Sequence, residues 1–232
     1  MKTIGLIGGL SWESSAVYYR IINQLVQSKL GGVHSAKCIM YSVDFAQFDE
    51  LQHRGDWPRL TDLMIDAGMR LKNGGADFLI ICTNTMHKVA DEVERQVEIP
   101  LIHIADAAAT EVKKQGLSKV ALLGTKFTME QDFYKNRLVQ KHGIAVMIPE
   151  QEERELVHSV IYQELVVGKL LKSSREAFAK IINRMCEAGA EGVVLGCTEI
   201  PLLISQKDCV VPVFDTMQLH ATAAVEYSLS GI

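Results

Sequence analysis

The chain has 232 residues, of which 48% are apolar and 22% are charged, and its formal net charge is −4. This composition is typical of a globular protein with one large or two small domains, and the charge gives no electrostatic reason to expect nucleic acid or an anionic membrane as a partner. No apolar run reaches the length of a membrane span. The N-terminal segment lacks the longer apolar stretch and the cleavage site of a signal peptide, which predicts a cytoplasmic protein.

The cysteines and histidines are spaced like those of a reduced protein without a structural metal. The five cysteines are odd in number, no pair has the Cys-x-x-Cys spacing, and the seven histidines include no His-x-x-x-His pair. We therefore expect free thiols, no disulfide framework and no metal site. The cysteines are Cys38, Cys82, Cys186, Cys197 and Cys209.

In the first half of the chain, apolar runs alternate with amphipathic segments, which predicts strands alternating with helices. Two glycine pairs end the first two of these helices. A polar segment, residues 44–57, predicts a loop. The expected strands are residues 3–7, 38–43, 78–81 and 101–104, and the expected helices are residues 14–30, 58–73 and 87–97.

The second half repeats this alternation. Strands that alternate with helices imply parallel sheets with helices on both faces, so the predicted fold is α/β. We expect two domains, the first from residues 1–98 plus 208–232 and the second from residues 99–207. The expected strands are residues 120–123, 144–148, 193–195 and 211–214, and the expected helices are residues 129–141, 150–167, 173–188 and 216–229.

One stretch of the chain occurs twice. Residues 189–199 read Gly-Ala-Glu-Gly-Val-Val-Leu-Gly-Cys-Thr-Glu, and residues 75–85 read Gly-Ala-Asp-Phe-Leu-Ile-Ile-Cys-Thr-Asn-Thr. Each indicates a helix end, a buried strand and a sharp turn. Aligned on their first glycines, the stretches place Thr83 opposite Cys197. Two further strand matches occur in the same order at nearly constant spacing, which favours two related halves, although unrelated βα units also look alike.

Turns rich in glycine, threonine and asparagine follow four of the predicted strands. Ligands of parallel sheets bind beyond the carboxyl ends of the strands, so these turns converge on one cleft if the two halves face each other. The first of them, Gly8-Gly9, fits amides that approach a carboxylate better than a nucleotide site, because no Gly-x-Gly-x-x-Gly or Walker lysine is present. The turns are residues 8–9, 83–85, 125–128 and 197–199.

Cys197 is the strongest candidate for chemistry. A free cysteine has a pKa of ~8.5, and we expect the helix that follows this turn to lower it toward neutrality. The thiolate could then abstract a proton or attack a carbon. The alternative is a buried and inert cysteine, which is common in proteins.

Neutral hydrogen-bond donors stand near the starts of the helices that follow these turns. Asn84, Thr85, Thr128 and Thr198 either cap those helices or bind carboxylates with the help of the helix dipole. Arg54 is available to pair with a second carboxylate, or is an exposed loop arginine.

Three turns together resemble the signature of the aspartate/glutamate racemase family: Gly8-Gly9-Leu10-Ser11, Thr83-Asn84-Thr85 and Gly196-Cys197-Thr198-Glu199. The segment Cys82-Thr83-Asn84-Thr85-Met86-His87 resembles the branch that acts on aspartate and glutamate, and the resemblance covers essentially the whole chain. It implies two pseudo-symmetric domains with the active site in the cleft between them, and a homodimer. It also implies α-proton transfer without pyridoxal phosphate or metal.

In the family that the chain resembles, two cysteines face each other across the substrate α-carbon. Cys197 stands at the position of the second, and Thr83 departs from the pattern at the position of the first. A threonine hydroxyl is a far weaker acid than a thiol, and Cys82 is a poor substitute because neighbours on a strand point to opposite faces. The resemblance therefore predicts Cys197 as the main base, Thr83 as a handicapped second group, and a preference for L-substrate.

The resemblance also implies a substrate pocket. It assigns Asn84, Thr85 and Thr198 to the α-carboxylate or amine of the substrate. Val166 occupies the position of a substrate-binding lysine of some aspartate racemases, which leaves Arg54 for the distal carboxylate. The further residues that it places around the pocket are Leu10, Gln52, Arg54, Thr128, Glu164 and Glu199.

These observations predict a cytoplasmic, cofactor-independent racemase whose partner is a small acidic amino acid, aspartate or glutamate. One alternative is a related isomerase, such as a hydantoin racemase or a maleate isomerase. The other is a binding protein for an acidic amino acid, with catalysis weakened by Thr83. Exchange of the α-proton in heavy water separates catalysis from binding alone.

Overall fold

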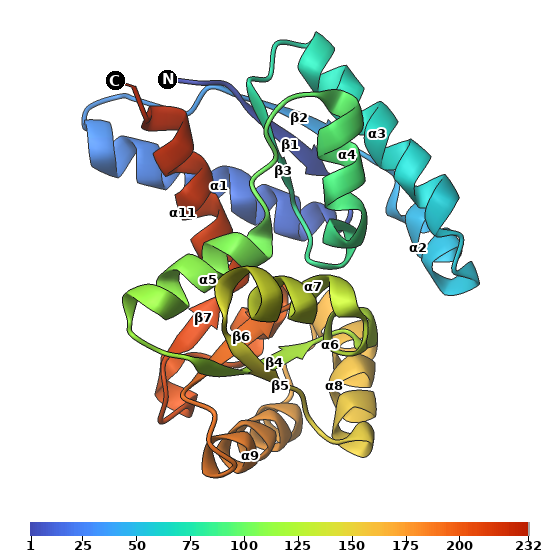
Figure 1. Cartoon of the computed structure of the whole chain (residues 1–232), viewed down its shortest axis with the longest axis vertical. Coiled ribbons are helices and arrows are strands. Elements are labelled where there is room, and N and C mark those ends of the chain that lie inside the picture. The colour runs from blue at the N-terminus through green and yellow to red at the C-terminus, as the bar shows by residue number, and fades with distance from the viewer. Residues whose placement is uncertain (232) are drawn as a thin grey trace. The chain divides into compact units, whose positions relative to one another are not determined.

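A computed structural model of the chain describes residues 1–231 and divides into two compact units (Figure 1). The first unit is Met1–His103 with His220–Ile232, and the second is Ile104–Leu219. The predicted domain boundaries lie earlier in the chain, at 98/99 and 207/208. The second boundary of the units falls later because the last strand, β7 (Val213–Asp215), pairs with a strand of the second unit.

The first unit contains a three-stranded parallel sheet in the order β2-β1-β3. Both β1 and β3 are buried at every position, as expected for apolar strands that helices cover on both faces. The predicted parallel α/β arrangement is therefore confirmed for this unit. The strands are β1 (Ile4–Gly8), β2 (Cys38–Ser42) and β3 (Phe78–Ile81).

Helices cover both faces of this sheet. They are α1 (Trp12–Leu30), α2 (Phe45–Arg54), α3 (Trp57–Asn73), α4 (Ala90–Val97) and α11 (Thr216–Leu229), with the 3₁₀ turn η1 (Thr85–Val89). Because successive strand side chains point to opposite faces, Leu79 and Ile81 pack with side chains of α3 and α4. Phe78 points the other way and meets Tyr227 of α11 with ring centroids 4.8 Å apart.

The second unit contains a four-stranded parallel sheet in the order β5-β4-β6-β7. Its strands besides β7 are β4 (Lys119–Gly124), β5 (Ala145–Met147) and β6 (Gly192–Gly196). Its longer helices are α5 (Ile104–Lys114), α8 (Gln151–Gln163) and α9 (Lys172–Glu187). Its short helices are α6 (Lys126–Glu130), α7 (Asp132–Asn136), the π-helix η2 (Arg137–Lys141), η3 (Leu165–Val167), α10 (Ile200–Leu203) and η4 (Gln206–Asp208).

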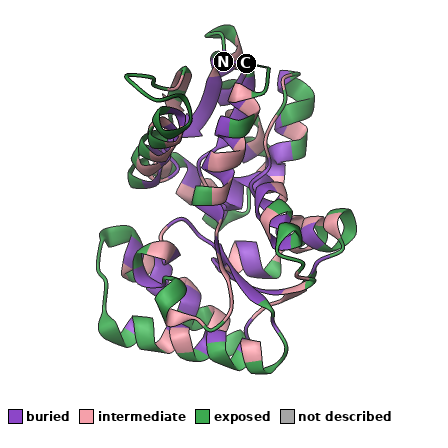
Figure 2. Ribbon diagram, turned by 90° about the vertical axis from the view of Figure 1, so that its left-hand side faces the viewer, coloured by how far each residue is buried: buried purple, intermediate pink, exposed green. Residues whose placement is uncertain are grey.

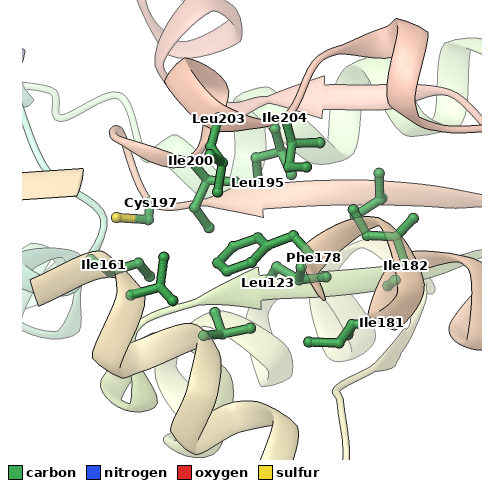
Figure 3. Close-up of a cluster of buried hydrophobic side chains, with 14 of the residues drawn as sticks. Leu123, Ile161, Phe178, Ile181, Ile182, Leu195, Cys197, Ile200, Leu203 and Ile204 are labelled. Atoms are coloured by element: carbon green, nitrogen blue, oxygen red, sulfur yellow. The ribbon is translucent and has the colours of Figure 1, made fainter. Parts of the chain in front are cut away.

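Alternation along the strands divides the core of this unit into two clusters. Leu123 and Leu195 pack with Phe178 of α9 on one face (Figure 3). Leu122 and Val194 pack on the other face with α5, α7 and η2. Strands β1, β3, β4 and β6 are buried almost throughout, whereas the outer faces of the helices are exposed (Figure 2).

The two sheets repeat one another, as the sequence repeat predicts. The order β2-β1-β3 in the first corresponds to β5-β4-β6 in the second. The register is also the same at aligned residues, since Ile4 pairs with Phe78 and Val120 pairs with Gly192. Thr83 and Cys197 therefore follow equivalent strands, β3 and β6, at equivalent positions.

Three predicted elements are wrong. The expected loop 44–57 is mostly α2, whose N-cap is Asp44; the side chain of Asp44 accepts a hydrogen bond from the Ala46 N–H. The expected strand 101–104 is reduced to a single bridge between Leu79 and Leu101, because α5, which the sequence did not predict, begins at Ile104. The expected helix 129–141 is broken into α6, α7 and a π-helical turn.

No helix within residues 1–231 is both long enough and apolar enough to cross a membrane.

Candidate active site

Cys197 directly follows β6 and carries the clearest chemical feature of the second unit. Its side chain is 7% exposed and borders the apolar cluster beside Leu195 and Ile200, with the sulfur pointing away from them (Figure 3). The thiol donates a hydrogen bond to Glu199 Oε2 at 3.0 Å, and the Thr198 hydroxyl donates to the same oxygen at 2.8 Å. One carboxylate oxygen thus holds both side chains of the turn.

Burial raises the pKa of the Cys197 thiol well above its usual value, and the charge and hydrogen bond of Glu199 raise it further. Hydrogen bonds from the backbone N–H groups of Glu199 and Ile200 act in the opposite direction and are weaker. The expectation that a following helix lowers this pKa is therefore wrong. The physical reason is that α10 has only four residues, whereas desolvation and a neighbouring carboxylate both favour the neutral thiol.

Thr128 lies beside the same turn. It is fully buried, and its N–H donates to the Thr125 side chain, which caps α6. A Cβ atom on Gly196 would lie only 3.0 Å from Thr128 Cγ2, so a glycine at the end of β6 allows α6 to approach the strand closely. The structure thus brings Thr128 to the Cys197 turn through packing.

Glu164 lies at the C-terminal end of α8 and is bound to the neighbouring helix. Its Oε2 accepts a hydrogen bond from the Ser174 hydroxyl of α9 at 2.5 Å. Two residues later, Val166 is 37% exposed.

The equivalent turn of the first unit follows β3. Thr83 is half-buried, while Asn84 and Thr85 are buried. The imidazole Nδ1 of His87 donates to the Thr83 carbonyl oxygen at 2.8 Å. Gln52 is also buried here, and its amide lies 3.3 Å from the sulfur of Met86 in η1.

Two cations lie on α2 and η1, the elements that carry Gln52 and Met86. Arg54, at the exposed end of α2, forms an ion pair with Glu50 at 2.5 Å. Lys88 lies in η1 with its Nζ 3.7 Å from the centroid of the Trp57 ring, and partial burial lowers the pKa of its ammonium group.

The glycine loop after β1 has a backbone conformation that favours glycine and is hydrogen-bonded to α1. Gly9 has φ +85°, and a Cβ atom there would lie 2.2 Å from the Val43 carbonyl oxygen, so only glycine fits. Its N–H donates to Ser15 Oγ at 2.9 Å, which directs this amide toward α1. Leu10, the next residue, is buried in the first unit's core.

The structure therefore forms two groups of candidates. Cys197, Thr198, Glu199 and Thr128 gather at one turn, whereas Glu164 is tied to α9. The residues that gather at the turn after β3 are Thr83, Asn84, Thr85 and Gln52, whereas Arg54 is turned to Glu50. Cys82 is fully buried, and burial raises the pKa of its thiol. In the described part of the chain, no three His, Cys, Asp or Glu side chains are grouped as metal ligands.

Residues 7–224 of the chain match the Asp/Glu/hydantoin racemase family. The chain belongs to this family. The match includes the turns after β3 and β6 and extends over most of both units.

Solved structures and curated relatives place the chain among racemases. A candidate Asp/Glu racemase from Yersinia pestis is 51% identical, with a TM-score of 0.95 over 99% of this chain and 100% of that one. An aspartate racemase homologue from Pyrococcus horikoshii OT3 is 38% identical, with a TM-score of 0.86 over 98% and 99%. The broad specificity amino-acid racemase RacX of Bacillus subtilis (strain 168) is 20% identical over 183 residues, 75% of each chain.

His87 and Met86 were not recognised as site residues from the sequence. His87 stands four residues after Thr83, which is the spacing at which a side chain on a helical turn reaches back to a carbonyl group. That spacing is the signal that could have identified it.

Proposed function

We propose that this chain is a cofactor-independent racemase of aspartate or glutamate in which Cys197 is the base for the L-enantiomer. The observation that carries the proposal is the hydrogen bond from the Cys197 thiol to Glu199 at the end of β6. Cys197 stands at the position equivalent to Thr83, which follows β3. The choice of an acidic amino acid rests on family membership and on the relatives at 51% and 38% identity.

The proposed reaction begins with proton transfer from the Cys197 thiol to Glu199. The thiolate then removes the α-proton of the L-substrate, so that a C–H bond breaks and an S–H bond forms. Return of a proton from sulfur to the same face regenerates the L-enantiomer. In heavy water the thiol hydrogen exchanges with solvent first, and the returned atom is deuterium.

Substrate binding offsets the high pKa of the thiol. Burial and the charge of Glu199 both raise the pKa of the Cys197 thiol and so favour its neutral form. An α-ammonium group that arrives within a few ångströms stabilises the thiolate by charge attraction. The base is therefore generated where substrate is present.

Net inversion needs a proton from the opposite face, and we propose that Thr83 stands there. Its hydroxyl does not ionise readily and transfers a proton only with help from a hydrogen-bonded group or water. Exchange on the L-face should therefore be faster than net racemisation. The equilibrium constant between enantiomers is unaffected, because both have the same free energy in water.

The remaining contacts of the proposed pocket are polar. Asn84, Thr85 and Thr198 are proposed to hold the α-carboxylate or amine, and Arg54 to hold the distal carboxylate. For Arg54 this requires exchange of its Glu50 ion pair for the substrate. Because that pair is exposed, breaking it costs little free energy.

Proton NMR in heavy water tests the proposal. We expect the α-proton signal of L-aspartate or L-glutamate to disappear much faster than that of the D-enantiomer. Loss of neither signal, combined with thermal stabilisation of the protein by the same ligand, would establish a binding protein instead. The raised thiol pKa and the hydroxyl at Thr83 are the observations that favour this second candidate.

A further inference from the structure

Three buried histidines lie behind the Thr83 turn in the first unit. The rings of His87 and His103 are 4.6 Å apart between centroids, and those of His87 and His220 are 5.4 Å apart. All three side chains are at least 96% buried. The three rings therefore pack against one another on the buried side of the turn.

The hydrogen bonds of the cluster fix which ring nitrogens carry protons. His220 Nε2 donates to the Ile102 carbonyl at 2.7 Å, and its Nδ1 accepts from the Tyr18 hydroxyl at 2.9 Å. Burial lowers the pKa of His220 to about 4, so this ring is neutral near pH 7. His87 bonds to a carbonyl oxygen, which can only accept, so its Nδ1 carries hydrogen.

The bond from His87 controls the direction of a peptide group. A trans peptide is planar, with its C=O and N–H pointing in opposite directions. Because His87 holds the Thr83 carbonyl toward the buried histidines, the N–H of Asn84 points away from them. The same constraint fixes the backbone from which the Thr83 side chain projects.

The equivalent turn after β6 is held differently. There the Cys197 carbonyl accepts from the backbone N–H of Ile200 at 3.3 Å. The residue aligned with His87 is Pro201, which has no such donor. In the turn after β3, the backbone bond runs instead from the His87 N–H to the Asn84 carbonyl at 3.1 Å. The Thr83 carbonyl thus accepts a hydrogen bond from the imidazole of His87, whereas the Cys197 carbonyl accepts one from a backbone N–H.

We propose that His87 is a positioning residue for the reaction. It fixes the Thr83–Asn84 peptide so that the Thr83 side chain and the Asn84 N–H are presented to substrate before substrate arrives. This inference rests on the proposed function, because it assumes that this turn contacts the amino acid. The positioning is done by the hydrogen bond from His87 Nδ1 to the Thr83 carbonyl oxygen.

Two substitutions separate this role from simple packing. His87→Asn keeps an N–H donor close to the position of Nδ1, whereas His87→Leu fills similar space without a donor. We expect His87→Leu to lower kcat/KM for α-proton exchange of L-substrate by roughly 10- to 100-fold, the loss that a small misplacement causes. His87→Asn should recover most of that loss.

A matched control accounts for lost stability. Val26→Ala removes fully buried apolar atoms from α1 in the same unit, and should lower the melting temperature without changing kcat/KM. Equal kcat/KM in wild type and His87→Leu would overturn the proposal. An Asn variant as slow as the Leu variant would also overturn it, since the donor would then not be what matters.

Two further readouts separate failure of this inference from failure of the proposed function. Nitrogen-15 NMR of the imidazoles should show His87 in the Nδ1–H form, whatever the reaction, and the Nε2–H form would contradict the inference. Calorimetry should give weaker binding of L-aspartate or L-glutamate to His87→Leu than to wild type and His87→Asn. Binding without exchange in the wild type would refute racemisation, and the ratio of dissociation constants would still decide the role of His87.

Discussion

The turns after β3 and β6 stand at equivalent positions of two similar sheets, yet their chemistry differs. After β6, a thiol and a hydroxyl both donate to the carboxylate of Glu199. After β3, the aligned residue is Thr83, and its carbonyl is held by the imidazole of His87. The turn after β6 thus carries a thiol hydrogen-bonded to a carboxylate. The turn after β3 carries a hydroxyl, and an imidazole holds its backbone carbonyl in place.

This difference teaches that a repeated backbone does not guarantee a repeated reaction. The register of the central strands is the same in both units, so the positions of Thr83 and Cys197 follow from the fold. Which of them can take a proton depends on the side chain and on its immediate neighbours. The proposed enzyme is thus symmetric in architecture and asymmetric in acid–base chemistry.

The largest effect should come from removal of the thiol. Cys197→Ser should reduce α-proton exchange of L-substrate by on the order of 10²- to 10⁴-fold, the usual contribution of a positioned base. Circular dichroism and the melting temperature should stay close to those of wild type, since oxygen replaces sulfur at the edge of the core. Exchange at the wild-type rate would make Cys197 a structural cysteine.

The second test makes the two turns alike. Thr83→Cys places a thiol on the opposite face, and exchange of D-substrate should rise by at least roughly tenfold because a thiol is a competent acid and base. Thr83→Ser keeps a hydroxyl and serves as the matched control. If wild type already exchanges both enantiomers equally, a group other than Thr83 acts on the D-face.

The third test removes the carboxylate that distinguishes the β6 turn. Glu199 raises the pKa of Cys197, so Glu199→Gln should shift the pH midpoint of Cys197 alkylation downward. Exchange should nevertheless fall by roughly 10- to 100-fold, because the acceptor for the thiol proton is lost. Alkylation is read at Cys197 by mass spectrometry, with Cys197→Ser as the blank. A midpoint that rises or stays fixed would contradict the assigned role of Glu199.

The smallest effect concerns the buried histidines behind the β3 turn. The pKa of His220 falls from 6.5 to about 4 on folding. Between these values the unfolded chain binds the proton and the folded chain does not, so the free energy of unfolding should decrease as pH falls from 6.5 to 4. The loss attributable to this group is at most roughly 3 kcal/mol.

Urea unfolding at pH 6.5 and pH 4.5 measures this loss. His220→Gln keeps an N–H donor for the Ile102 carbonyl but does not titrate, so stability should depend less on pH in this variant. His34→Gln removes an exposed histidine and provides the control. An unchanged pH dependence in His220→Gln would show that this imidazole does not contribute.

The sequence predicted the fold well where apolar periodicity decides it. The strand 78–81 and the helix 216–229 were predicted with the bounds that the structure has. The segment 44–57 was misread because its apolar residues are sparse. Its helix depends on the Asp44 cap and on packing of Phe48, which is 1% exposed, and tertiary packing of this kind is not visible in local propensity.

The candidate site could be predicted as far as the repeat and the family resemblance reached. They identified Cys197, Thr83 and their flanking donors, because an apolar strand followed by a turn can be recognised in the sequence. The pKa direction of Cys197 was missed, since it depends on burial and on where the Glu199 carboxylate points. Those are properties of the folded chain rather than of residue spacing.

The division of the first unit into two pieces of chain has a consequence for the order of folding. Lys2 donates its N–H to the Ser228 carbonyl at 2.9 Å, and the Ser228 hydroxyl donates to the Lys2 carbonyl at 2.6 Å. During synthesis residues 104–219 emerge before Ser228 does, so the second unit can complete its sheet before α11 reaches the first unit. In a chain truncated after Leu219, we expect hydrogen exchange to show protected amides in β4 and β6 and unprotected amides in β1. Equal protection of all three strands would contradict this order, in which β1 lies beside β2 and β3 early but lacks the packing of α11 until residues 220–229 are made.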